Sequence, residues 1–169
     1  DKGPGGGTVF YVGVSKVNSS GEKYAGGSTM EFLDANQEWN IAFDCTEVIS
    51  GTEKGIGAGA QNTTLFKDKC PRVLRSLPIV TTWDYGKNGT SDWFIPSYDE
   101  LNLICRYTRG QSTDTTEKCD GKLAPIAGVN STTTFWSSTQ HSKQSQFAIS
   151  FQTGNEVVAR KVQKNRFLI

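Results

Sequence analysis

The sequence predicts an α+β domain, with strands near both chain ends and two helices and long loops between them. Segments typical of strands lie before residue 44 and after residue 131, and both helical segments lie between these regions. This order differs from the regular alternation of strands and helices in a parallel α/β sheet. With 169 residues, the chain is long enough to bury one substantial core.

A glycine-rich leader, residues 1–7, precedes the first predicted strand, Thr8–Val14. That strand is apolar on both faces, which predicts burial on both sides. A second strand is predicted at Thr29–Leu33, and apolar residues alternate within Asp34–Phe43. Residues 8–169 are expected to form one domain.

The strongest local signal is Ser91–Tyr107, where a short apolar run leads into a helix. Ser97 and Glu100 have the spacing of a capping box, in which each side chain bonds a backbone N–H near the helix start. An earlier helix is predicted in the later part of Ile56–Lys69. The core face of the capped helix is predicted to hold Leu101, Ile104, Cys105 and Thr108.

Three strands are predicted near the end of the chain: Thr132–Ser138, Ser145–Phe151 and Glu156–Lys164. Thr153, Gly154 and Asn155 are typical of a hairpin turn between the last two. In the middle strand, alternation predicts Phe147, Ile149 and Phe151 inward, and Gln146, Ala148 and Ser150 outward.

Four widely spaced cysteines favour two disulfides in an exported protein over a zinc site. Three pairings are possible, and we favour the sequential ones, Cys45–Cys70 and Cys105–Cys119. The second would tie the capped helix to a polar loop, Gln111–Lys118, for which the sequence suggests no other anchor. The alternative is four reduced thiols in a cytosolic protein.

The charge balance argues against a nucleic-acid or membrane partner, because 18 basic and 17 acidic residues leave a net charge of only +1. No segment is apolar over the length of a membrane span. His141 is the only imidazole, and no nucleophile motif or metal-ligand cluster is present. We therefore expect no enzymatic activity and no cofactor; the remaining calcium candidate, formed by Asp84, Asn88 and Asp92, is weak.

A basic cluster near the end of the chain is the best candidate site. It contains four cations within seven residues: Arg160, Lys161, Lys164 and Arg166. Lys143 is expected to flank it. In an extended strand Arg160, Lys164 and Arg166 would share one face. Guanidinium and ammonium groups suit the acidic groups of a polysaccharide, although such clusters also serve simply as solvated edges.

Three stretches in this order resemble a bacterial extracellular family named after the C-terminal domain of the Legionella collagen-like adhesin. They are Gly3–Tyr11 (GPGGGTVFY), Ser91–Asn102 (SDWFIPSYDELN) and Phe135–Thr139 (FWSST). Relatives often end in a Val-Arg-x-Val run, whereas this chain ends Arg166-Phe167-Leu168-Ile169. Gly3-Pro4-Gly5 fits the end of a collagen-like stalk, and it also belongs to the family's opening motif.

The resemblance implies a C-type-lectin-like fold and a trimer at the tip of a collagen-like stalk, secreted or on the cell surface. It also implies binding of sulfated glycosaminoglycans or other acidic polysaccharides in host attachment and biofilm. Two alternatives are a trimerisation or capping domain without a ligand, and a protein-receptor module using Trp83, Tyr85 and Trp93.

Overall fold

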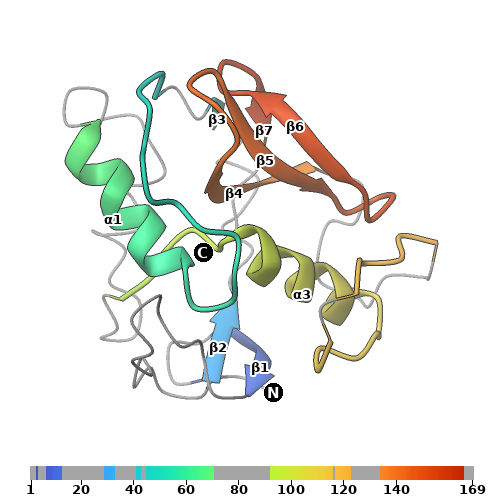
Figure 1. The fold of residues 1–169 in the computed structure, drawn as a ribbon. Helices are drawn as coiled ribbons and strands as arrows, with labels where there is room; N and C mark the ends of the chain where they lie inside the picture. Colours follow the sequence, from blue (N-terminus) through green and yellow to red (C-terminus); the bar gives the residue numbers. More distant parts are fainter. Residues whose placement is uncertain are drawn as a thin grey trace.

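The computed structural model describes residues 3, 7–12, 29–32, 41–42, 45–70, 92–115, 117–122 and 134–165. Helices and strands carry the labels of Figure 1. Within these residues the α+β class is confirmed: helices α1 (Gly59–Lys69) and α3 (Tyr98–Thr108) accompany a three-stranded antiparallel sheet. The sheet contains β4 (Thr134–Gln140), β5 (Ser145–Ser150) and β6 (Glu156–Arg160), in that order.

Two short antiparallel strand pairs complete the described strands. β1 (Thr8–Val12) pairs with β2 (Thr29–Phe32), which confirms the cores of both early strand predictions. β3 (Ile41–Ala42) pairs with β7 (Lys164–Asn165), so residues from opposite parts of the chain lie side by side.

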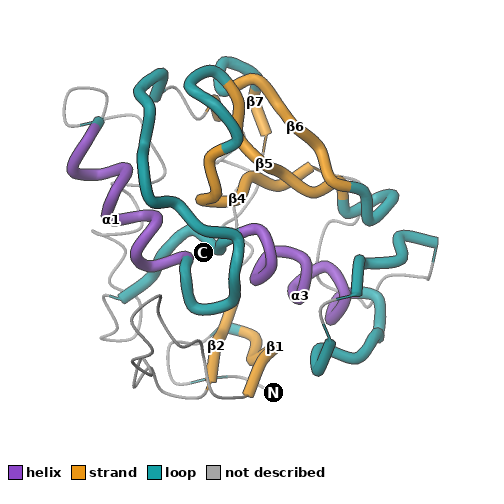
Figure 2. The backbone as a smooth tube through the Cα atoms, viewed as in Figure 1, coloured by secondary structure: helices purple, strands orange, loops and turns teal. Residues whose placement is uncertain are grey.

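Helix α3 lies between the β1–β2 pair and the three-stranded sheet (Figures 1 and 2). The capping box at its start is confirmed: Ser97 Oγ accepts the Glu100 N–H, and Glu100 Oε2 accepts the Ser97 N–H at 2.7 Å. The four predicted core positions are buried, but so are five other residues of this helix. Because α3 has neighbours on opposite sides, it buries far more than the single face expected from the sequence.

The sheet separates two hydrophobic clusters. Phe135 of β4 packs with α3 in the first cluster, whereas its neighbour Trp136 joins Phe66 of α1 in the second. The predicted outward orientation in β5 is therefore wrong for Gln146 and Ala148, which are both fully buried. α1 packs against the sheet from this second side, so part of each face of the sheet is covered.

Both favoured disulfides are confirmed. Cys45–Cys70 joins the loop at 45–50 to the end of α1, and Cys105–Cys119 joins α3 to the loop that follows it. The Cα atoms of the two pairs are 6.1 and 5.9 Å apart. Disulfides of this kind persist in oxidising compartments such as the cell exterior. Among the described residues, neither helix has the length and hydrophobicity to cross a bilayer.

Candidate functional site

The serines of Phe135–Thr139 are buried and join β4 to its neighbours. Ser137 Oγ donates to the carbonyl of Phe147 at 2.7 Å, within a stretch where the β4–β5 register shifts. The N–H of Ser138 donates to the carbonyl of Pro96 at 2.8 Å. This motif therefore holds β4 against the segment before α3 and does not form a ligand-binding surface.

The loop before α1 is fixed by side chains of β4 and α1. Thr139 Oγ1 donates to the carbonyl of Glu53 at 2.9 Å and accepts the N–H of Tyr98 at 3.0 Å. Asn62 Oδ1 accepts the N–H of Glu53 at 2.9 Å, and its Nδ2 donates to the Glu53 carbonyl at 2.8 Å. The backbone of the next residue, Lys54, accepts the N–H of Asp99 at 2.9 Å. Lys54 is thus presented from a well-anchored backbone.

Glu100 links the starts of both helices through one buried carboxylate. Its Oε2 bonds the Ser97 N–H of α3, and its Oε1 accepts the N–H of Gly57, just before α1, at 2.7 Å. The N-cap of α1 is Ala58, which has no capping side chain. Burial raises the pKa of Glu100, and the N–H groups of Ser97, Gly57 and Gly59 oppose that shift.

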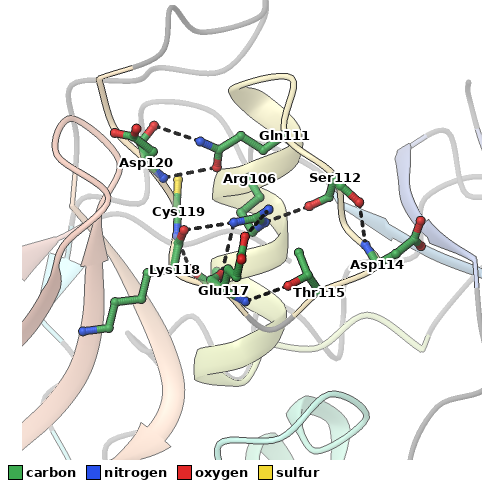
Figure 3. Close-up of polar contacts among 10 residues, drawn as sticks. Arg106, Gln111, Ser112, Asp114, Thr115, Glu117, Lys118, Cys119 and Asp120 are labelled. Atoms are coloured by element: carbon green, nitrogen blue, oxygen red, sulfur yellow. Dashed lines mark hydrogen bonds and ion pairs between the residues drawn. The ribbon is translucent and has the colours of Figure 1, made fainter.

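Arg106 fixes the polar loop after α3 and is not a surface cation (Figure 3). Its Nε donates to the carbonyl of Ser112 at 2.7 Å, and its Nη1 donates to the carbonyl of Lys118 at 3.0 Å. Its Nη2 also lies 3.6 Å from Glu117 Oε2. The expectation that only the disulfide anchors residues 111–118 is therefore wrong.

The terminal basic cluster does not form one extended strand. β6 ends at Arg160, and a turn follows in which the Gln163 N–H donates to the Arg160 carbonyl at 2.9 Å. Lys164 belongs to β7, where its backbone faces Ala42. The side chain of Lys164 and all of Arg166 lie outside the described structure. The predicted single strand Glu156–Lys164 is consequently wrong, and the common face of Arg160, Lys164 and Arg166 stays a prediction.

Lys161 is buried, with only 1% of its surface exposed. Its Nζ donates to the carbonyl of Cys45 at 2.6 Å and to that of Glu47 at 3.4 Å. Burial lowers the pKa of Lys161 from 10.5 to about 8, against the opposing effect of the Glu47 carboxylate. Lys161 therefore fastens the loop at 45–47 and is not available to a polymer at the surface.

Two of the predicted site residues, Arg160 and Lys143, are exposed and lie at one end of the sheet. Arg160 lies opposite Ser145 in the β5–β6 register. Lys143 lies in the turn between β4 and β5, and the next residue, Gln144, accepts the N–H of Lys161 at 2.9 Å. These two predicted site residues are therefore brought together.

A third exposed cation, Lys54, lies in the loop before α1. Its Nζ lies 3.8 Å from the centroid of the Phe147 ring and 4.6 Å from that of Tyr98. It also lies 3.3 Å from Glu156 Oε2. Phe147 is two residues beyond Ser145 in β5. The ring under Lys54 therefore lies about 7 Å along the strand from the residue opposite Arg160.

We call the resulting region the Phe147 surface. It consists of Lys54, Tyr98, His141, Lys143, Phe147, Glu156, Val158 and Arg160.

Aromatic rings and one carboxylate shape the electrostatics of the Phe147 surface. His141 packs edge-on against Phe147 with ring centroids 5.0 Å apart, and its Nδ1 lies 3.0 Å from Ser145 Oγ. The Tyr98 hydroxyl bonds to the Glu156 carboxylate, and burial together with this negative charge raises the pKa of Tyr98 to about 12. Lys54 and Glu156 thus lie beside a small apolar centre, and Arg160 lies opposite Ser145 in the same pair of strands.

Two other candidates from the sequence lie largely outside the described residues. Within the described residues, no group of three or more histidine, cysteine or acidic side chains is placed to hold a metal ion. Asp84 and Asn88 of the calcium candidate lie outside those residues, as do Trp83 and Tyr85 of the receptor alternative. Trp93, the remaining aromatic of that alternative, is 9% exposed.

Comparisons with protein-family models, with curated proteins and with solved structures find no match to this chain.

Sequence reasoning missed Lys54, Tyr98, Phe147 and Glu156 as members of one surface. They come from a loop, a helix and two strands, and are brought together only by tertiary packing. The alternating pattern of β5 did identify Phe147, but as a core residue. Lys54 lies in a glycine-rich segment with no charge cluster around it, so no local signal marked it.

Proposed function

We propose that this chain is an extracellular bacterial adhesin domain that binds sulfated glycosaminoglycans or other acidic polysaccharides through the Phe147 surface. One observation carries the proposal: Arg160 and Lys143 are exposed at one end of the sheet and Lys54 is exposed over Phe147, further along the same strands, whereas Lys161 and Arg106 are buried in structural contacts. Cations at separate positions on a surface suit a polymer with repeated acidic groups.

We also propose, from the three sequence motifs, a C-type-lectin-like fold and membership of the Legionella collagen-like adhesin family. The two disulfides are consistent with a secreted or cell-surface location. In this proposal the domain is a homotrimer and acts in attachment and biofilm without enzymatic activity. Three copies of the Phe147 surface would add avidity to individually weak contacts.

The proposal is tested by heparin affinity with the double variant Arg160→Ala/Lys143→Ala. Both side chains are exposed, so we expect an unchanged melting temperature. We expect weaker binding and a smaller dependence of affinity on salt, because fewer counterions are released. Binding is measured by isothermal titration calorimetry from low to physiological salt.

The matched control is Lys69→Ala/Lys118→Ala, which removes two exposed lysines from the end of α1 and from the loop after α3. If both double variants lose the same affinity, the Phe147 surface has no special role. Binding that is insensitive to salt would contradict an electrostatic mechanism altogether.

A further inference from the structure

The Phe147 surface contains one carboxylate, Glu156, which is paired with Lys54. Glu156 lies at the start of β6 and accepts hydrogen bonds from Lys54 and from the Tyr98 hydroxyl. Tyr98 is the first residue of α3 and its N–H is held by Thr139, so the partner that orients Glu156 is itself fixed. The carboxylate therefore has a defined position beside the Lys54 ammonium.

The ion pair between Lys54 and Glu156 is accessible to solvent. The side chains are 44% and 35% exposed, respectively. Exposed ion pairs are weak and are screened by salt, so an incoming anion can take the place of Glu156 at Lys54. Lys54 also rests on the Phe147 and Tyr98 rings, and these contacts hold the ammonium in place whichever anion pairs with it.

We propose that Glu156 is a selectivity residue that disfavours polysaccharides carrying only carboxylates and permits those with densely spaced sulfates. This inference rests on the proposed function. A polysaccharide that carries only carboxylates would replace one carboxylate, that of Glu156, with another at Lys54. The exchange therefore adds little binding free energy. A sulfated chain with closely spaced anions can engage Lys54, Arg160 and Lys143 together and so compensate for displacing Glu156.

The first experiment compares Glu156→Gln with the parent protein for heparin, which is sulfated, and hyaluronan, which carries only carboxylates. Glutamine keeps the shape of the side chain and removes its charge. We expect hyaluronan affinity to rise about fivefold, the upper range for one exposed charge pair, and heparin affinity to rise less. The ratio of the two affinities should therefore fall.

Asp114→Asn is the matched control, because Asp114 is an exposed carboxylate on the loop after α3. It removes the same charge from the protein but should leave the affinity ratio unchanged. An equal effect of both substitutions would overturn the inference, because net charge alone would then explain the gain. The folded state of each variant is checked by its melting temperature.

The second experiment repeats Glu156→Gln in a Lys54→Met background. If Glu156 acts by occupying Lys54, its removal should give no further gain once Lys54 is absent. A gain of the same size in both backgrounds would overturn the inference and leave the proposed function intact. Absence of heparin binding by both the parent and Glu156→Gln at low salt would overturn the proposed function, and this inference with it.

Discussion

Arg160 and Lys161 are adjacent in the sequence, yet one is exposed and the other is buried. The difference arises because β6 ends between them and the chain turns inward over the loop at 45–47. The buried ammonium group of Lys161 is stabilised by the carbonyls of Cys45 and Glu47 but has lost its hydration. Lys161 therefore has a structural role that its charge alone would not suggest.

Stability should rise with pH because of Lys161. Its pKa is about 8 in the folded protein and 10.5 when unperturbed, so the unfolded chain binds more protons between these values. We expect the free energy of unfolding to increase by about 2 kcal/mol from pH 7.5 to 9.5, as measured by urea denaturation. Below pH 10 the raised pKa of Tyr98 contributes little, and above it that group opposes the gain.

Lys161→Met should lack this rise, whereas Lys69→Met, at an exposed position, should retain it. Parallel pH profiles for the parent and Lys161→Met would show that another group is responsible.

The starts of α1 and α3 are joined as one unit by the carboxylate of Glu100. The capping box was evident from the spacing of Ser97 and Glu100, because that signal is local. The hydrogen bond from the Gly57 N–H to Glu100 was not evident from the sequence, because it depends on how α1 packs against α3. Helix α1 thus begins without its own capping side chain and borrows one from another helix.

Gly59→Ala should destabilise this unit even though alanine favours a helix by roughly 0.5–1 kcal/mol over glycine. A Cβ atom at Gly59 would lie 2.3 Å from Glu100 Oε2 and 2.7 Å from the Phe94 ring. We expect a net loss of about 1–3 kcal/mol in the free energy of unfolding, measured by denaturant titration.

Gln61→Ala, at an exposed position two residues later, should be nearly neutral. A stabilising effect of Gly59→Ala would mean that helix propensity outweighs the close contact.

The loop after α3 contains contacts that could not be predicted from the sequence. The Cys105–Cys119 bond was favoured among three possible pairings, but the part played by Arg106 was not predicted. An arginine near the end of a helix is usually exposed, and its sequence context does not reveal three backbone carbonyls converging on it. The same limitation applies to Lys54, whose aromatic partners come from distant segments.

Across the whole molecule, the α+β class and the hairpin turn at Gly154 followed from local patterns, and the confirmed cysteine pairing was the favoured one of three that the sequence allowed. The burial of Gln146 and Ala148 could not be predicted, because alternation in β5 gives no information about what covers its polar side. Gln146 is accommodated there by donating to the carbonyl of Ser137 at 3.0 Å. Tertiary packing thus decides how each strand face is used.

Removal of either disulfide by a Cys→Ala pair should cost about 3 kcal/mol, because the closed loops have sequence separations of 25 and 14 residues. Denaturant titration measures this cost.

For Cys105→Ala/Cys119→Ala we expect the backbone amide at position 119 to stay protected from hydrogen exchange, because Asn102 Oδ1 accepts its hydrogen bond at 2.9 Å. Loss of that protection would show that the disulfide, and not the side chains of α3, positions the loop.

The β3–β7 pair has a consequence for the order of folding. It joins Ile41 to Asn165, so the polypeptide between them must be brought into one closed loop before these strands can meet. Closing so long a loop is entropically costly, whereas the β4–β5–β6 hairpins and the capped helix need only nearby residues. On a ribosome, therefore, this pair cannot form until nearly all of the described chain has been synthesised, and it completes a fold whose local parts can form earlier.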